Sequence, residues 1–566
     1  MAGRSARQTI SCLHAIRNRY GHEAASEKQQ LLEALALQET RSASDLGRLH
    51  ATLCFLRAFP DSTEVHELAG RELRGLAARV STLGRQQIGC LDDSGIAGTV
   101  LNYAFSWEVA SWIARRFPGV AIIDWESMGD TSRLDELLEH LLHHTESDYF
   151  DSGHVNTEEW LRISAEHSQG TDFDWLMSEF RDRRHQRQFW TSMYNAADIP
   201  LRCQLGDSAL SKTFNEFGDA PVVTRSEPMQ NRVYRAKQEV MKPLRSIQLL
   251  SASDGQRLLD VAMSSLAVRH RETIHFNTAN PSEVWMADVG RGVKIAALGL
   301  TPEGRYPLEC TMGFLILSNG VPIGYGGSSM FYRQANNGIN IFDEYRGSEA
   351  AWLWVQVMRV FHALSGCNRF IANPYQFGED NVEALKSGAF WFYYRLGYRP
   401  VKADIRKLAR NEYAKVSKGE RTPINVLRTL ATCDMHFVLP DAQQSEYFDE
   451  AWIEFASLLA TREIAKTRQS SRRRATDAIA HRLSADLGLA SMDGWSAEER
   501  RWFIRLAPIV SATHPAAWPK RDRNALVAML RAKGGPDERD YIRRFGRHKR
   551  FFAVLKKACR SVAAEH

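Results

Sequence analysis

The chain has 566 residues, of which 44% are hydrophobic and 25% are charged, with a net charge of +6 and a mean hydropathy of −0.36. This length exceeds the roughly 250–300 residues that one hydrophobic core serves, so we expect about three domains. No stretch approaches the roughly 18 uninterrupted apolar residues of a membrane-spanning helix, and we expect no membrane as a partner.

Eight cysteines are scattered along the chain, and none belongs to a C-x-x-C pair. Disulfide scaffolds are short and dense in cysteine, and zinc sites use closely spaced cysteine and histidine ligands. The first residues also lack the apolar run of a secretory signal. We therefore expect reduced thiols, a cytoplasmic location and no metal.

The charge is unevenly distributed. Residues 461–566 hold 24 lysines and arginines against 11 aspartates and glutamates, a net charge of +13, which leaves −7 for the rest of the chain. A basic region attached to an acidic body can bind nucleic acid or an acidic protein, including an acidic carrier. The alternative is a set of helices with solvated charged faces.

Residues 1–225 are predicted to be a mainly helical N-terminal region, because their apolar residues recur at helical spacing. Pro60 interrupts this pattern, and Asp61 or Ser62 can cap the helix that follows. Residues 119–127 form a short apolar run that ends in acids, which predicts a strand. Nothing in this region indicates a function.

Residues 240–440 are predicted to be a domain with a mixed β-sheet. Strands are expected at 246–251, 293–300 and 433–439, with a helix after Ser251. Residues 310–331 contain Ser-Asn-Gly between two apolar runs, a strong signal for a hairpin because Asn and Gly both tolerate positive φ. After this domain, residues 441–566 are predicted to be a basic helical region.

Residues 338–400 predict a strand, a glycine-marked turn, a helix, a strand and a second helix. A strand that runs through Gly347 into a helix exposes unpaired backbone N–H groups at the start of that helix, and these groups with the helix dipole favour a phosphate. The alternative is that Gly347 and Ser348 merely turn the chain and cap the helix.

The order of these elements resembles the GNAT family of acyl-CoA N-acyltransferases over about 200 residues. Two motifs carry the resemblance: Glu344-Tyr345-Arg346-Gly347, similar to the family's pyrophosphate loop, and Phe392 to Tyr398, similar to its Phe-Tyr-x-Lys-Leu-Gly-Phe helix end. The resemblance implies an α+β fold, with a GNAT-like sheet between two mainly helical regions. It also implies acyl-CoA as a co-substrate, bound by Arg346, Gly347, Ser348, Glu349, Ala350 and Ala351.

Glu349 departs from the family pattern, since it occupies the position of the middle glycine. A carboxylate beside a pyrophosphate is repelled unless its side chain turns away. The direction of the Glu349 side chain therefore decides between two interpretations of this turn, a donor site and a turn that binds no coenzyme.

The resemblance places Tyr393 where the family has a phenol that protonates the departing thiolate, a role within reach of a group with a pKa near ~10. Tyr394 is the alternate, and an aromatic core face is the alternative for both. Asp343 and Glu344 are candidates for the base that frees the amine. His275 is a further catalytic candidate.

Four residues are predicted to bind the acceptor. Asn373, Tyr375 and Gln376 follow a strand and can line the acceptor cleft, and Glu272 lies where the family has acceptor-binding helices and loops. The acceptor is expected to be a small-molecule or peptide amine.

Two functions follow from these residues. The first is an N-acyltransferase in which the amine attacks the thioester directly, with acyl-CoA or a carrier-bound acyl or aminoacyl group as the donor. The second is a non-catalytic GNAT-like scaffold whose basic residues 461–566 bind nucleic acid or an acidic partner.

Overall fold

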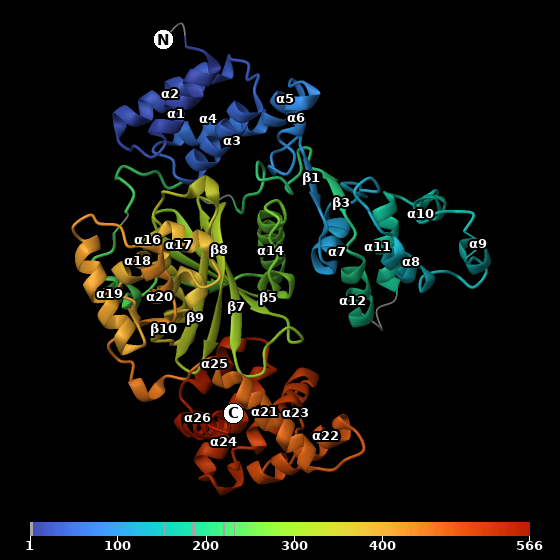
Figure 1. Ribbon diagram of the computed structural model, residues 1–566, viewed down its shortest axis with the longest axis vertical. Coiled ribbons are helices and arrows are strands. Elements are labelled where there is room, and N and C mark those ends of the chain that lie inside the picture. Colours follow the sequence, from blue (N-terminus) through green and yellow to red (C-terminus); the bar gives the residue numbers. More distant parts are fainter. Residues whose placement is uncertain (1–3, 152, 183–186, 219–220, 231, 566) are drawn as a thin grey trace.

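The computed structural model describes residues 4–151, 153–182, 187–218, 221–230 and 232–565. A group of helices at the N-terminal end and a bundle at the C-terminal end flank a large central sheet, and a smaller lobe lies beside the sheet (Figure 1). The predicted α+β class, a large mixed sheet with helical regions on either side, is confirmed at this level.

The N-terminal helices pack around an apolar core. They are α1 (Ala6–Ile16), α2 (His22–Ala36), α3 (Ala43–Ala58), α4 (Thr63–Arg74), α5 (Leu76–Ser81) and α6 (Arg85–Gly89). Pro60 lies between α3 and α4, as expected, and the Ser62 hydroxyl accepts a hydrogen bond from the backbone N–H of Val65 at 3.1 Å. Of the two predicted capping residues, Ser62 is the one that caps α4.

The smaller lobe contains a three-stranded antiparallel sheet with the order β1-β3-β2. Its elements are β1 (Val100–Tyr103), α7 (Trp107–Arg116), β2 (Ala121–Ile123), α8 (Ser132–Glu139), α9 (Ser147–Asp151), α10 (Thr157–Ala165), α11 (Asp172–Asp182), α12 (Arg187–Ala197) and β3 (Leu201–Gln204). The sequence indicated only the strand within 119–127. The strands β1 and β3 are four residues each, too short for a clear alternating pattern.

Among the described residues, the central sheet has nine strands in the order β11-β12-β10-β9-β8-β7-β6-β5-β4. They are β4 (Ser246–Leu249), β5 (Ala279–Gly290), β6 (Val293–Leu300), β7 (Cys310–Ser318), β8 (Val321–Phe331), β9 (Gln334–Ile341), β10 (Arg369–Ala372), β11 (Arg399–Pro400) and β12 (Met435–Val438). Only β9 and β10 pair in parallel, and the other neighbours are antiparallel.

Helices and 3₁₀ turns connect these strands. They are α13 (Ala236–Met241), α14 (Ala252–Ala267), α15 (Ile274–Asn277), η2 (Asp343–Tyr345), α16 (Ala350–Ser365), η3 (Pro374–Phe377), α17 (Val382–Ser387), α18 (Ala389–Leu396), α19 (Ala403–Val416), α20 (Ile424–Leu430) and η4 (Gln444–Glu446). The helix expected after Ser251 is α14, and α16 is the crossover between the two parallel strands.

The hairpin expected at Ser-Asn-Gly joins β7 and β8. Asn319 and Gly320 have φ values of 47° and 81°, so both turn residues adopt the left-handed conformation that this signal requires. Further along the hairpin and into β9, three glycines pair directly across the strands: Gly313 with Gly327, and Gly327 with Gly338. Since directly paired residues point to the same face of a sheet, these glycines form a row without side chains on one face.

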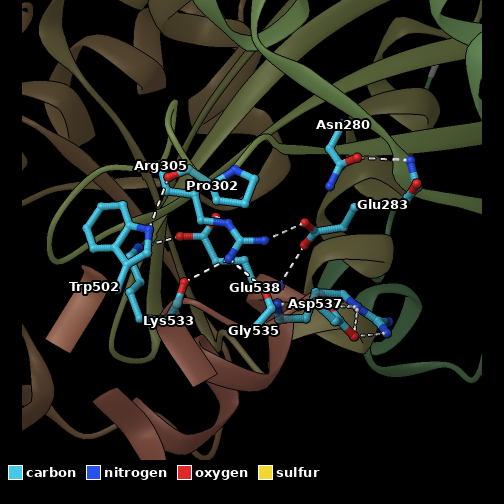
Figure 2. A network of polar contacts seen from close by, with 11 residues as sticks. Asn280, Glu283, Pro302, Arg305, Trp502, Lys533, Gly535, Asp537 and Glu538 are labelled. Atoms are coloured by element: carbon cyan, nitrogen blue, oxygen red, sulfur yellow. Dashed lines mark hydrogen bonds and ion pairs between the residues drawn. The ribbon is translucent and has the colours of Figure 1, made fainter. Parts of the chain in front are cut away.

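The C-terminal bundle consists of α21 (Trp452–Lys466), α22 (Arg472–Leu487), α23 (Ala497–Ser511), η5 (Pro515–Ala517), α24 (Lys520–Lys533), α25 (Glu538–Phe545) and α26 (Lys549–Ala563). Buried charges fix it to the sheet (Figure 2). Arg305 lies 2.9 Å from Glu283 of β5, and Lys533 forms an ion pair with Glu538; all four side chains are at most 1% exposed. The basic region is therefore docked onto the sheet, with part of its charge used inside the protein.

Candidate active site

The turn between β9 and α16 is formed by η2 and Gly347. Gly347 has a φ of 86°, and a Cβ at this position would meet no atom within 4 Å, so glycine is required by the backbone conformation and not by crowding. Arg346 points to solvent, where its guanidinium lies 2.9 Å from Asp343 and 3.3 Å from Glu383. The first N–H groups of α16 follow directly after this turn.

Glu349 turns inward. Its carboxylate lies 2.6 Å from Arg225 and 2.7 Å from Arg291, accepts a hydrogen bond from the backbone N–H of Gln230 at 2.8 Å, and is 1% exposed. Two guanidinium groups thus neutralise the charge that departs from the family pattern. The repulsion expected between this carboxylate and a phosphate is removed by partners that the sequence motif does not contain.

The remaining residues of the predicted loop lie at the start of α16. Ser348 is buried and its hydroxyl has no hydrogen-bond partner. Ala350 begins the helix, and Ala351 lines a cavity of about 660 Å³ between α16, α18 and α19. The cavity is lined by Arg232, Val233, Tyr234, Ala351, Phe392, Arg395, Leu396, Tyr413, Val416 and Ser417. Its lining contains two arginines and no acidic residue, which suits an anion.

The parallel strands β9 and β10 separate after three residue pairs. Pairing joins Gln334–Asn336 to Arg369–Ile371, whereas β9 continues to pair with β8 as far as Ile341. Within these described strands, residues 337–341 therefore have no pairs on the β10 side. Asn337, the first residue beyond the pairing, is 1% exposed, and neither polar atom of its side chain has a partner.

Gln376 and Tyr393 lie where the strands separate. A Cβ on Gly338 would lie 3.0 Å from Nε2 of Gln376, and the hydroxyl of Tyr393 donates to Oε1 of Gln376 at 3.2 Å. Asn373 caps η3, where its side chain accepts from the backbone N–H of Gln376 at 3.3 Å and helps to fix that residue. Tyr375 is 58% exposed.

The two tyrosines have different surroundings in the structure. Tyr393 is buried among Trp354, Phe377 and Tyr398, and its hydroxyl reaches the strand separation. Burial raises the pKa of Tyr393, so its phenol stays protonated at neutral pH. Tyr394 instead packs against an aromatic cluster of Phe390, Trp391 and Tyr413.

His275 lies against the glycine row. A Cβ on Gly327 would lie 2.8 Å from both Cε1 and Nε2 of His275, and a Cβ on Gly313 would lie 3.1 Å from its Cβ. Gly338 is the next member of the row and contacts Gln376, so His275, Gln376 and Tyr393 gather on one face of the sheet. Burial lowers the pKa of His275, which keeps the imidazole neutral near pH 7.

Glu344, a predicted base, belongs to a different cluster. Its carboxylate lies 3.1 Å from Lys212 and 3.2 Å from Arg269. Burial by itself raises the pKa of Glu344, but Arg269 and Lys212 outweigh burial and lower it well below its ordinary value. A carboxylate held in its charged form accepts a proton poorly, so these surroundings do not favour Glu344 as the base, and its predicted role stays a prediction. Asp343 points to solvent beside Arg346.

A carboxylate with the opposite property lies on the face of the glycine row. The side-chain amide of Asn336 in β9 donates to Glu450 at 2.8 Å, and Asn336 points to the same face as Gly338, two residues further on. Burial raises the pKa of Glu450 to about 7; the amide of Asn336 opposes this change, and Asp434, Glu309 and Asp449 add to it. A general base works best when its pKa is close to the working pH.

Sequence reasoning missed Glu450, and no local signal marks it. The residue lies in a loop between η4 and α21, more than one hundred positions after Asn336. Only the fold brings the two together.

Glu272 lies apart from this group. It lines a second cavity, between the smaller lobe and α15, where its carboxylate accepts hydrogen bonds from the backbone N–H of Ser106 at 2.9 Å and from the Ser106 hydroxyl. Its predicted role in acceptor binding remains a prediction.

The remaining findings concern membrane-spanning helices, metal-binding groups, the cysteines and the comparison with known proteins. No helix within the described ranges is long and apolar enough to span a membrane, and the described part of the chain contains no group of three or more His, Cys, Asp or Glu residues that could hold a metal ion. All eight cysteines are free thiols. Comparison with protein-family models, with curated proteins and with solved structures found no match.

Proposed function

We propose that the central domain is a GNAT-like N-acyltransferase that moves an acyl group from a thioester donor, such as acyl-CoA, to an amine. The observation that carries this proposal is the separation of β9 from β10 directly beside the start of α16. An extended donor arm finds unpaired backbone groups along residues 337–341, and a phosphate finds the free N–H groups of the helix start.

Three local features fit such a donor. The unpartnered side chain of Asn337 lies at the separation, and the unpartnered hydroxyl of Ser348 lies at the helix start. The cavity beyond Ala351 offers Arg232 and Arg395 to a charged group. Glu349, neutralised by Arg225 and Arg291, no longer argues against a phosphate in the turn.

In this proposal the acceptor lies on the face of the glycine row. Glu450 takes a proton from the amine, whose nitrogen attacks the thioester carbon and forms the C–N bond. An unpaired N–H of β9 stabilises the oxyanion. The C–S bond then breaks, and the leaving sulfur takes a proton from Tyr393, which Gln376 orients. His275 bounds the site on the side of β7 and β8.

Thermal unfolding in the presence of acetyl-CoA and of longer acyl-CoAs tests the donor site. A ligand at about 100 times its Kd stabilises the folded state by about 2.7 kcal/mol, which gives a clear rise in Tm. The Ala351→Glu variant, which adds a carboxylate to the cavity lining, should lose the rise, and Ala497→Glu, at an exposed position at the start of α23, should keep it. No rise with any acyl-CoA would rule out a free coenzyme donor and leave a carrier-bound donor.

A second function is favoured by one observation. A cavity of about 780 Å³ between α26 and the loop around η4 is lined by Lys549, Lys556, Lys557 and Arg560, with Glu446 as the one acidic residue in that lining. This concentration of positive charge suits a phosphate-rich partner, as in the scaffold hypothesis.

Deletion of residues 461–566 is a poor test of this function, because it removes Lys533 and Glu538 from the buried network of Figure 2. Point variants avoid that damage. The variant Lys549→Glu/Lys557→Glu should abolish a salt-dependent gel shift of RNA or DNA, and Lys407→Glu, at an exposed position of α19, should not. A gel shift unchanged by Lys549→Glu/Lys557→Glu would show that nucleic acid binds at a surface other than this cavity.

A further inference from the structure

The cavity that contains Glu272 is built by two parts of the chain. Residues 104–106 and Glu108 come from the end of β1 and the start of α7, Tyr194, Asn195 and Asp198 come from α12 and the residue after it, and residues 272–274, 277 and 278 come from α15 and its flanks. The cavity has a volume of about 530 Å³, within the range of small-molecule sites.

The charge of this lining has one sign. Glu108, Asp198 and Glu272 are carboxylates, and the described residues that line the cavity include no lysine, arginine or histidine. Ser106 donates two hydrogen bonds to Glu272 but brings no positive charge. Three negative charges in the lining of one cavity favour a ligand that carries more than one positive charge.

The carboxylates are arranged for an organic cation and not for a metal ion. The described residues contain no group of three His, Cys, Asp or Glu side chains close enough to hold a metal, so these carboxylates are spread along the lining. A diamine or polyamine has separated ammonium groups that match separated carboxylates. Phe105 and Ile274 give its methylene segments an apolar contact.

A second observation points to a ligand. Tyr194 lines the cavity and is 1% exposed, yet its hydroxyl has no hydrogen-bond partner among the residues that the structure describes. The hydroxyl of Thr273, also in the lining, is buried and unpartnered as well. A buried hydroxyl without a partner is costly, and both can be satisfied by a ligand in this space.

The short helix α15 separates this cavity from the glycine row. Ile274 and Asn277 line the cavity, whereas His275 lies between them in sequence and contacts Gly313 and Gly327 on the sheet. The short helix α15 therefore lies between a ligand in this cavity and the face of the sheet to which Gln376 and Asn336, the partner of Glu450, belong.

We propose that this cavity binds the acceptor, a diamine or polyamine, through Glu108, Asp198, Glu272 and the hydroxyl of Tyr194. The inference rests on the proposed acyl transfer. One ammonium group stays in the cavity. A second ammonium group gives a proton to Glu450, and its nitrogen attacks the thioester carbon and forms the C–N bond. The C–S bond breaks and the leaving sulfur takes a proton from Tyr393, which regains one from the attacking nitrogen. The product is an amide with one positive charge fewer.

Isothermal titration of the full chain with spermidine tests the site. Asp198→Asn removes one charge from an exposed position with a φ of 47°, which asparagine tolerates. Tyr194→Phe removes a hydroxyl that bonds to nothing in the protein, so the fold keeps its stability. Each variant should weaken spermidine binding by at least about tenfold, because a hydrogen bond or ion pair to a charged group is lost.

Glu126→Gln provides the matched control, since Glu126 is an exposed carboxylate of the same lobe outside the cavity and should leave the affinity unchanged. Spermidine that fails to bind the wild type, or that binds Asp198→Asn and Tyr194→Phe as tightly as wild type, overturns the site.

Mass spectrometry of the products separates this inference from the proposed function. Acylated spermidine, formed by wild type and reduced in Tyr194→Phe, supports both. Acyl-CoA binding without spermidine binding overturns the cavity as the acceptor site and leaves the transferase. Spermidine binding with no rise in Tm from any acyl-CoA and no acylated product overturns transfer from acyl-CoA to this acceptor and leaves the cavity as a polyamine site.

Discussion

The two ends of β9 treat a buried carboxylate in opposite ways. Beyond its last residue, Glu344 meets Lys212 and Arg269, and Glu349 meets Arg225 and Arg291. Near its start, Glu450 meets the neutral amide of Asn336, with other acids around it. Burial raises the pKa of any carboxylate, and only the sign of its neighbours decides whether it stays ionised.

The two kinds of carboxylate also suit different roles, one in stability and the other in proton transfer. A carboxylate between two cations keeps its charge and stabilises the fold through its pairs. A carboxylate with a pKa of about 7 exchanges a proton near neutral pH, as a general base must. The sequence made Asp343 and Glu344 candidates for the base, and the surroundings of Glu344 and Glu450 favour Glu450.

The largest effect is expected from Glu450→Gln. If Glu450 is the base, this change lowers the rate of acyl transfer by about 10²- to 10⁴-fold, since glutamine accepts no proton. The measurement is the rate of thiol release from acyl-CoA. Glu454→Gln, at an exposed position of α21 close by, serves as the control and should keep the wild-type rate. Equal rates of thiol release for Glu450→Gln and Glu454→Gln would show that Glu450 is not the base.

Glu344→Ala should lower the free energy of unfolding and not the rate of acyl transfer. Removal of this carboxylate leaves the partly buried Lys212 and Arg269 without their partner, a change that costs about 3–5 kcal/mol in comparable fully buried cases. Chemical denaturation measures the loss. A decrease in the free energy of unfolding of less than about 1 kcal/mol would show that the cluster of Glu344, Lys212 and Arg269 is solvated. Glu344 and Glu450 would then differ less in their surroundings than we infer.

The two carboxylates should also give opposite slopes of stability against pH. The folded-state pKa of Glu450, about 7, lies above its unfolded value. Its contribution is therefore fully present below the unfolded pKa of about 4.3 and is lost as the pH rises through about 7. Glu344 has a lowered pKa, so its contribution is present above the unfolded value and lost as the pH falls.

Denaturation of Glu450→Gln at two pH values measures this slope. The variant should match wild type at about pH 4.5 and exceed it by on the order of 2 kcal/mol at about pH 8, where wild type must bury a charge. A wild type that is the more stable protein at the higher pH would mean that Glu450 is ionised and well paired.

The smallest effect is expected at Arg346. This guanidinium is mostly exposed and pairs with Asp343 and Glu383 at the surface, so Arg346→Ala should change the free energy of unfolding by less than about 0.5 kcal/mol. Its affinity for acyl-CoA, measured by calorimetry, should fall if the proposed donor site is correct. A large loss of stability would instead make Arg346 part of the fold and not of the donor site.

Local signals were sufficient for much of the central sheet. The hairpin at Asn319 and Gly320, the helix after Ser251 and the turn at Gly347 were all visible, since each depends on backbone conformations that neighbouring residues impose. The strand β5 was missed, because it begins with Asn280, Pro281 and Ser282, which are typical of a loop.

In the candidate site, too, some features follow from the local sequence and others depend on the tertiary structure. The sequence by itself determined the strand, turn and helix around Gly347 and selected Gln376 and Tyr393, which the fold brings together. Only the tertiary structure decided the state of each acid: Arg269 lies 75 positions from Glu344, and Asn336 lies 114 positions from Glu450. A pKa depends on burial and on charges a few ångströms away, and the chain supplies both from segments that no local pattern connects.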